Sequence, residues 1–346
     1  MDQTSRRERV IAALKHHQSD IIPHFCEFTE QARENIKQYF THLDFEATEL
    51  DNHLLYQQYW GWPTEFNPKS ESGHFKDEYG VLWNRTGVDR DIGIVDRPLI
   101  DSPNIDLWPE PAFDEQRFRS AIERVVRQDS DQFKFFGIGF SLFERAWSYL
   151  TIEEALYNMA AEESFMHNLF EKICAYNLKL ISIINEYPLD AIYFGDDWGQ
   201  QKGTMMGPMN WRKFIKPHLT KMYASARAKG KYVIQHSCGD ISEIFPDLIE
   251  IGLDCYQTFQ TEIYDMAIFK REYGRDLAVW GGISTQQLLP KASPDEIRRE
   301  TIRIMKVMGQ GGGYIAAPTH AVPHDVSFEQ IMAMQDVFQN QRIYLG

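Results

Sequence analysis

His236 and Cys238 directly follow the apolar run 231–235 and are separated by a single residue. Side chains in a strand alternate between its two faces, so residues two apart point the same way. An imidazole and a thiolate form a nitrogen and sulfur pair of the kind that binds zinc. A buried histidine beside a core cysteine is the competing interpretation. A zinc site therefore requires at least one more ligand from elsewhere in the chain.

Apolar runs of strand length alternate with helix-like segments from about residue 133 onward. The runs lie at 133–140, 189–194, 231–235, 254–259, 277–281 and 313–317. The helix-like segments lie at 152–186, 210–229, 241–251, 262–273, 294–309 and 327–340. Thr151 with Glu154, and Ser293 with Pro294 and Glu296, have the spacing of helix N-terminal caps. This alternation predicts repeated strand–helix–strand units around a parallel sheet.

The first 130 residues are less regular. We expect a helix at 5–14, a first strand at 21–28, a further barrel strand within 55–110, a hairpin or covering loop at 75–88, and a helix at 114–128. The predicted fold is a single (β/α)₈ TIM barrel over residues 1–346, with an N-terminal elaboration at 30–130 around its mouth. A doubly wound open sheet is the alternative, although no Gly-x-Gly-x-x-Gly turn follows an early strand.

Polar side chains follow these runs at their carboxyl ends, where the active site of such a barrel forms. They are Glu144, Asp196, Asp197, His236, Cys238, Gln257, Gln260, Thr319, His320 and His324. Strand alternation along 193–197 directs Asp197 rather than Asp196 to the centre, which favours Asp197 for substrate or acid–base work. Turn formation by the two aspartates, and an ion pair of Glu144 with Arg145, are the structural alternatives.

Three further groups of residues are candidates for binding. His320 is the expected third metal ligand, and His324 competes with it. Gly282 lies at the same end of the barrel, where it would let a substrate or cofactor approach the backbone closely. Aromatic side chains could wall a pocket for an apolar ligand, although core packing is the alternative: Phe140, Phe143, Tyr193 and Trp198.

Composition excludes several classes of protein. The chain has 346 residues, 43% of them hydrophobic, and a net charge of −14. It has no lysine or arginine run, so a nucleic-acid partner is not expected. No apolar stretch has the length of a membrane span, and the first residues lack the apolar core of a secretory signal. The four cysteines are too scattered for a disulfide scaffold, so we expect a reduced, cytoplasmic protein.

Five segments resemble the uroporphyrinogen decarboxylase superfamily, whose members are single (β/α)₈ barrels. They occur in order along nearly the whole chain: 7–14 with 20–23, 77–83, 193–199, 206–217 and 236–239. Porphyrinogen-decarboxylating members need no metal and carry an Arg-Gln-Ala-Gly-Arg segment after the first strand, which holds substrate carboxylates. Here residues 24–30 read His-Phe-Cys-Glu-Phe-Thr-Glu, and the next arginine is Arg33. Porphyrinogen decarboxylation is therefore not expected.

The zinc- and cobalamin-dependent methyltransferase branch of this superfamily is similar at His236 and Cys238. Its third zinc ligand is typically a cysteine in a Pro-Gly-Cys-Gly segment, and the matching segment here is Pro-Thr-His-Ala at 318–321. The resemblance therefore implies that His320 takes the place of that cysteine. Imidazole in place of thiolate leaves the centre more positive, which suits an O- or N-methyl donor better than activation of a thiol.

The expected activity is transfer of a methyl group from a small O- or N-methyl donor to the cobalt of a corrinoid protein. Zinc would bind His236, Cys238 and His320, and Asp197 or Glu144 would be a fourth ligand or protonate the leaving group. Gln257 and Gly282 would contact the cofactor. The corrinoid would arrive on a separate protein, because this chain has no Asp-x-His-x-x-Gly segment. A homodimer is compatible with this interpretation.

Two other functions stay open from the sequence. The first is a zinc-dependent lyase or hydrolase that acts on a small substrate. The second is a non-catalytic member of the superfamily that binds a tetrapyrrole or a partner protein. Metal content separates the second from the enzymes, and methyl transfer to a corrinoid protein separates the two enzymes.

Overall fold

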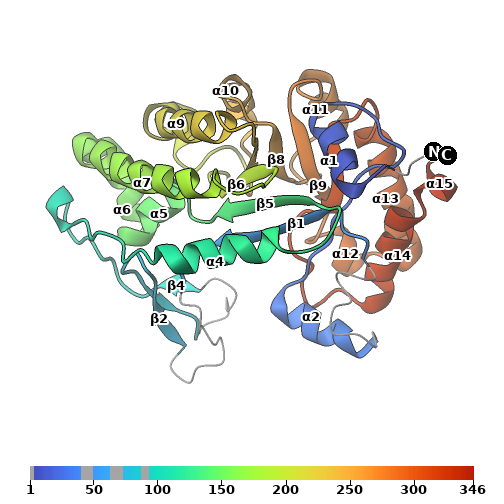
Figure 1. Cartoon of the computed structure of the whole chain (residues 1–346), viewed down its shortest axis with the longest axis horizontal. Coiled ribbons are helices and arrows are strands. Elements are labelled where there is room, and N and C mark those ends of the chain that lie inside the picture. Colours follow the sequence, from blue (N-terminus) through green and yellow to red (C-terminus); the bar gives the residue numbers. More distant parts are fainter. Residues whose placement is uncertain (1–3, 40–49, 63–72, 87–92) are drawn as a thin grey trace.

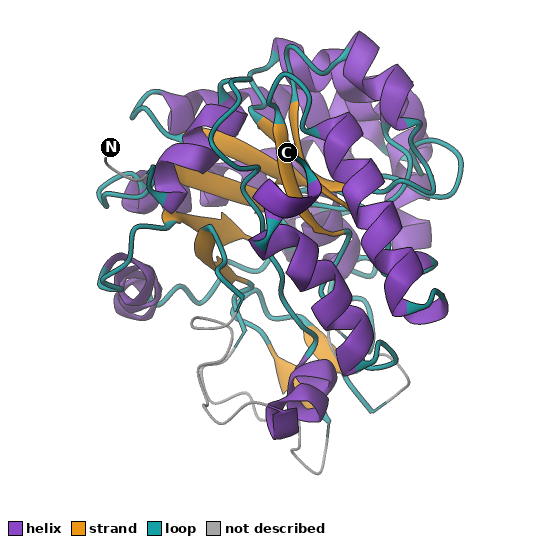
Figure 2. Cartoon of the chain, turned by 90° about the vertical axis from the view of Figure 1, so that its right-hand side faces the viewer, coloured by secondary structure: helices purple, strands orange, loops and turns teal. Residues whose placement is uncertain are grey.

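Seven parallel strands form the main sheet of the computed structural model, which describes residues 4–39, 50–62, 73–86 and 93–346. Their order is β1 (Leu54–Tyr59), β5 (Phe133–Ile138), β6 (Ala191–Gly195), β7 (Tyr232–His236), β8 (Cys255–Phe259), β9 (Ala278–Ile283) and β10 (Tyr314–Pro318). Consecutive strands are neighbours and are joined through helices, as right-handed β–α–β connections require. Figures 1 and 2 show the curled sheet with helices around it.

Residues 23–28 close the sheet between its two edge strands. The N–H of Phe25 donates to the carbonyl of Ala316 at 2.9 Å, and the N–H of His53 donates to the carbonyl of His24 at 3.0 Å. The segment forms isolated bridges, from His24 to Ala316 and from Phe28 to Val322, and not a regular ladder. The predicted strand at 21–28 is therefore present as an extended closing segment, and the predicted (β/α)₈ barrel is confirmed as the fold class.

The helices pack around the sheet. Those before β6 are α1 (Arg6–Leu14), α2 (Glu30–Ile36), α4 (Glu115–Val126), α5 (Phe143–Tyr149), α6 (Ile152–Ala161) and α7 (Glu163–Ile184). Those after β6 are α8 (Gly207–Asn210), a π-helical turn (Trp211–Ile215), α9 (Lys216–Arg227), α10 (Phe245–Glu250), α11 (Met266–Glu272), α12 (Leu288–Lys291), α13 (Pro294–Met308), α14 (Phe328–Gln339) and α15 (Gln341–Tyr344). Among the described residues, short 3₁₀ turns lie at Lys37–Tyr39, Ile105–Leu107 and Ser242–Ile244. No helix in the described ranges is both long and apolar enough to cross a bilayer.

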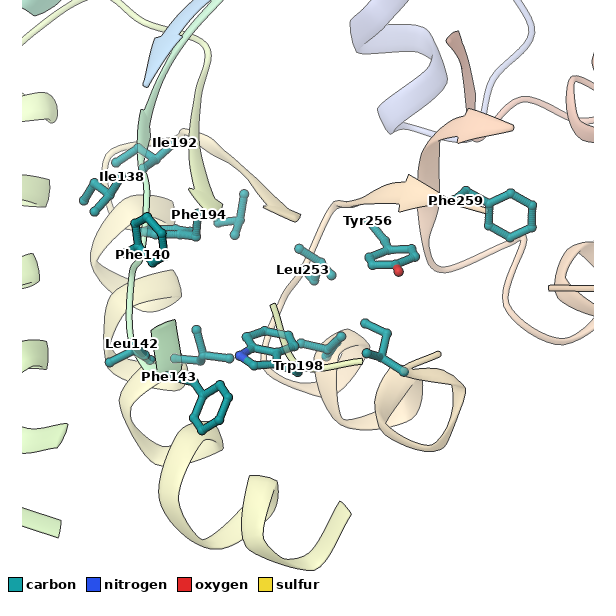
Figure 3. Close-up of a cluster of buried hydrophobic side chains, with 14 of the residues drawn as sticks. Ile138, Phe140, Leu142, Phe143, Ile192, Phe194, Trp198, Leu253, Tyr256 and Phe259 are labelled. Atoms are coloured by element: carbon teal, nitrogen blue, oxygen red, sulfur yellow. The ribbon is translucent and has the colours of Figure 1, made fainter. Parts of the chain in front are cut away.

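Successive side chains along each strand point alternately into two apolar layers. The inner layer fills the barrel with side chains such as Phe135, Tyr193 and Trp280. Val10 and Leu14 of α1 pack against this layer at the amino ends of the strands. The outer layer lies between the strands and the helices, and part of it is shown in Figure 3. Because both faces of the strands are buried, the strands read as continuous apolar runs in the sequence.

A small antiparallel sheet is set apart from the barrel strands (Figures 1 and 2). It comprises β2 (His74–Lys76), β3 (Leu82–Asn84) and β4 (Ile94–Val95), which confirms a hairpin within the predicted segment 75–88 as far as residue 86. Buried Asp77 accepts hydrogen bonds from the Trp83 indole at 2.9 Å and from Arg145 at 3.1 Å. This buried ion pair ties the small sheet to α5.

Some predicted boundaries were wrong. The helix predicted at 152–186 is interrupted at Glu162, whose φ of −132° and ψ of 56° are not helical. The segment 210–229 includes the π-helical turn, and the segment 262–273 becomes helical only after its cap at Asp265. The strand predicted at 133–140 ends at Ile138, and Phe140 beyond it has a φ of +51°. The predicted cap at Ser293, with Pro294 in the first turn, is confirmed, and it forms a full capping box with Glu296. At Thr151, where a capping box with Glu154 was predicted, the structure shows only the hydrogen bond from the N–H of Glu154 to the Thr151 hydroxyl.

Candidate metal centre and pocket

His236, Cys238 and His320 meet at the carboxyl ends of β7 and β10. Their ligand atoms all lie within 4.8 Å of one another, and Cys238 Sγ is 3.6 Å from His236 Nε2. In tetrahedral zinc sites, Zn–S is about 2.3 Å and Zn–N about 2.0–2.1 Å, which separates sulfur from nitrogen by about 3.6 Å. His324 is not in this group; it is exposed, and its carbonyl accepts a hydrogen bond from Asn35. The structure thus brings together the three residues that the sequence singled out.

The surroundings of the Cys238 thiol disfavour its ionisation in the absence of a metal ion. Burial raises the pKa of the Cys238 thiol, although the neighbouring His236 opposes this shift. A thiol in such a place loses its proton when a metal ion binds to the sulfur. His320 is exposed, and its ring centroid lies 6.1 Å from that of His236. The centre is therefore open to solvent on the His320 side.

Asp197 points to this centre and Asp196 does not. Asp197 Oδ1 lies 3.2 Å from His236 Nε2 and accepts a hydrogen bond from the N–H of Cys238 at 2.7 Å. Burial opposes its ionisation, but His236 and this N–H hold the pKa of Asp197 below its usual range. Asp196 is fully buried and accepts hydrogen bonds from the N–H groups of Phe143 and Glu144 at the start of α5. The alternation predicted for 193–197 is confirmed.

Glu144 faces the same space from the first turn of α5. Burial raises its pKa well above the usual range, and the negative charges of Asp197 and Asp196 add to this effect. Two carboxyl groups with opposite pKa shifts therefore lie beside the candidate metal centre. Such pairs are typical of sites where one group holds a proton and the other stays ionised.

A pocket of about 590 Å³ opens over these residues. Its lining includes Glu144, Tyr193, Asp197, His236, Gln257 and His320. Glu27 and Tyr56 were not among the predicted site residues, but they also line the pocket, and the Tyr56 hydroxyl donates a hydrogen bond of 2.8 Å to Glu27. Both lie in the irregular N-terminal part, where the sequence has no regular pattern that points to them. Arg33 is the single arginine among the described lining residues.

Several predicted pocket residues lie elsewhere. Phe140, Phe143 and Trp198 are buried in the outer apolar layer (Figure 3), so of the four aromatic candidates only Tyr193 lines the pocket. Gly282 does not line it either. A Cβ at Gly282 would meet the Tyr314 hydroxyl at 2.7 Å. The absence of a side chain at Gly282 lets Tyr314 of β10 and Ile304 of α13 pack closely against the backbone of β9. This packing gives no support to the predicted contact with a ligand.

Comparisons with known proteins agree with this architecture. The family model described as uroporphyrinogen decarboxylase (URO-D) matches residues 88–341. Two proteins named uroporphyrinogen decarboxylase, from two strains of Thermus thermophilus, are each 25% identical over 181 residues. These matches cover 52% of this chain and 50% of each relative, so the chain spans about half the length of the curated relatives.

A solved structure with the same fold is described as a methyltransferase from Methanosarcina mazei. It is 17% identical, with a TM-score of 0.69, and the match covers 97% of this chain and 100% of the other. At this identity the likeness concerns the fold alone. The family match covers well over half of the chain, and the protein belongs to the uroporphyrinogen decarboxylase (URO-D) family.

Proposed function

We propose that this protein is a zinc-dependent methyltransferase that moves a methyl group from a small O- or N-methyl donor to the cobalt of a separate corrinoid protein. The observation that carries the proposal is the convergence of His236, Cys238 and His320 at the mouth of the barrel. Three protein ligands with one position left open are characteristic of catalytic zinc sites, whereas structural sites use four.

The donor set fits zinc. One sulfur and two imidazole nitrogens match its ligand preferences, and the 3.6 Å between Cys238 Sγ and His236 Nε2 matches a tetrahedral centre. Zinc held here would supply a Lewis acid next to the pocket, where it would polarise the oxygen or nitrogen that carries the methyl group. Asp197 Oδ1, 3.2 Å from His236 Nε2, is placed to serve as a fourth ligand or to face the open position.

Glu144 is the residue we assign to proton donation. The sequence favoured Asp197 for this role, but the pKa of Asp197 is lowered beside His236 while burial raises that of Glu144. A protonated Glu144 would donate its proton to the oxygen or nitrogen left after the methyl group departs. General acids of this kind contribute typically 10²–10⁴-fold to the rate.

The acidic lining argues against a porphyrinogen as substrate. The carboxylates of Glu27 and Asp197 face the pocket, and Arg33 is the one arginine on its described lining. A ligand with many carboxylates would be repelled by these like charges, and few positive side chains on the described lining would offset the repulsion. A small uncharged or cationic methyl donor meets no such penalty.

The test is methyl transfer to a reduced corrinoid protein, followed by the change in cobalt absorbance. The purified, zinc-loaded protein is mixed with Co(I) corrinoid protein and a panel of methoxy compounds and methylamines. We expect methyl–cobalt formation with at least one donor, and its loss in Cys238→Ala. Zinc binding without methyl transfer to any corrinoid protein, accompanied by hydrolysis or elimination of a small substrate, would replace this proposal with the lyase or hydrolase.

A further inference from the structure

We infer that Gln257 is a positioning residue for His236: its side-chain oxygen keeps the hydrogen on Nδ1 and leaves Nε2 as the metal-binding nitrogen. Tyr193 in turn holds the Gln257 amide in place. The inference rests on the proposed zinc site, which it deepens by naming the residues that prepare one of its ligands.

The contacts begin with the sheet itself. His236 and Gln257 are partners in the parallel ladder between β7 and β8, so their side chains leave the sheet side by side. The N–H of Ser237 donates to the carbonyl of Gln257 at 2.8 Å, which fixes this register just beyond His236. Gln257 is only 5% exposed. Its amide therefore has little room to choose other partners.

The oxygen of this amide receives two hydrogen bonds. The Tyr193 hydroxyl donates to Gln257 Oε1 at 3.1 Å, and His236 Nδ1 lies in hydrogen-bond contact with the same atom. A carboxamide oxygen only accepts, so the Nδ1 atom of His236 must carry the hydrogen. The other ring nitrogen then faces Cys238 Sγ at 3.6 Å and Asp197 Oδ1 at 3.2 Å.

This arrangement is the one that a metal-binding histidine needs. Such histidines usually donate their second ring N–H to a carboxylate or carbonyl oxygen, which sets the tautomer and the ring plane. Loss of that partner typically weakens metal binding 10–100-fold. The Tyr193 ring also lines the pocket, so this chain of contacts runs from the pocket wall to the candidate ligand.

The strand pair offers a matched control. Gln235 is a buried glutamine on β7, and its Oε1 also accepts a hydrogen bond from a buried tyrosine, Tyr223, at 2.6 Å. Gln235 Nε2 donates to the backbone carbonyl of His236 at 2.8 Å, but this second pair makes no contact with a ring nitrogen of His236 among the described interactions. Tyr223→Phe therefore removes the same kind of hydrogen bond as Tyr193→Phe without touching the proposed role.

Two measurements test the inference. The first is the zinc dissociation constant, obtained by competition with a chromophoric chelator. We expect Gln257→Leu to weaken zinc binding 10–100-fold and Gln257→Glu, which still offers an acceptor oxygen, to restore it. Tyr193→Phe should weaken binding a few-fold and Tyr223→Phe should not change it. Wild-type affinity in a folded Gln257→Leu protein, checked by circular dichroism, would overturn the inference.

The second measurement needs no metal. In the metal-free protein labelled with ¹⁵N at histidine, we expect a slowly exchanging Nδ1–H signal from His236 that disappears in Gln257→Leu and returns in Gln257→Glu. An Nδ1 without hydrogen in the wild type would overturn the inference whatever the zinc result. A protected Nδ1–H in a wild-type protein that binds no zinc would uphold the positioning role and refute the proposed zinc enzyme.

Discussion

The carboxylate of Asp196 accepts a hydrogen bond from the indole N–H of Trp198 at 2.6 Å, inside the apolar layer between β6 and the helices. The same carboxylate accepts the N–H groups of residues 142, 143 and 144, which begin α5. No side chain of α5 itself caps its first turn. A residue from the end of β6 thus performs the capping of a helix that follows β5, and it holds Glu144 at the pocket.

Removal of this cap should lower stability. Asp196→Ala leaves buried N–H groups without partners, at roughly 1–3 kcal/mol for each group left unpaired. We expect the free energy of unfolding to fall by about 3 kcal/mol in urea, followed by circular dichroism. Asp197→Ala is the matched control, because it removes one hydrogen bond to a backbone N–H at a partly exposed site. For this variant we expect the free energy of unfolding to fall by about 1 kcal/mol. Equal losses in the two variants would refute the assigned capping role.

The choice between the two histidines after β10 can be measured directly. His320→Ala should reduce bound zinc to well below one ion per chain, because it removes one of the three proposed ligands. His324→Ala, four residues away and outside the ligand group, should keep full zinc content. The measurement is metal analysis after dialysis against a weak chelator. The reverse result would show that the pocket rearranges around His324 when metal binds.

Glu144 and Asp197 should differ in what their variants lose. Glu144→Gln keeps the shape of the side chain but cannot give up a proton as an acid, so turnover should fall by roughly 10²–10⁴-fold with zinc content unchanged. Asp197→Asn should also weaken zinc binding, because its oxygen faces His236 Nε2. Both effects are scored in the same preparations by metal analysis and by methyl transfer. Near-normal turnover in Glu144→Gln would remove this residue from the mechanism.

Two buried histidines predict a loss of stability in mild acid. Burial lowers the pKa of His24 to about 4, and burial together with the charge of His24 lowers the pKa of His53 to about 2. Unfolded histidine titrates near 6.5, so below that pH the unfolded chain takes up protons that the folded protein does not. Stability should therefore be unaffected by these groups above pH 7 and should fall as the pH drops from about 6.5 to 4.

His24 alone should contribute a loss of about 3 kcal/mol by pH 4, since one unit of pKa shift corresponds to about 1.4 kcal/mol. The check is a series of urea unfolding curves from neutral pH down to about the folded pKa of His24. His24→Phe keeps a ring against Phe338, whose centroid is 5.3 Å away, and removes the titrating group. This variant should show a shallower dependence on pH than the wild type. An unchanged slope would contradict the assignment.

The barrel and the cluster of candidate ligands at its mouth were predictable from the sequence because both depend on short-range patterns. Buried parallel strands read as apolar runs, and residues at their carboxyl ends meet at one mouth whatever their separation in the chain. His236, Cys238 and Asp197 were found in this way, whereas the resemblance to the superfamily favoured His320 over His324. Their convergence needed only the order of the strands.

What the sequence did not reveal depends on contacts between distant segments. The helix predicted at 152–186 is interrupted at Glu162 without a glycine or proline at that position. The capping role of Asp196 requires α5 to start beside the end of β6, and the interior role of Gly282 depends on Tyr314. The double contact of Gln257 requires the exact register of β7 and β8. Local periodicity carries no information on any of these.

The seam between residues 23–28 and β10 joins parts of the chain that lie near its opposite ends in the sequence, through Phe25 with Ala316 and Phe28 with Val322. His320 lies within this seam, between the two bridged residues of the late segment. A chain folded as far as β9 would hold His236 and Cys238 but would lack His320, the third candidate ligand. Assembly of the candidate metal centre thus coincides with closure of the barrel, and an ion bound there would link the segment after β10 to the end of β7.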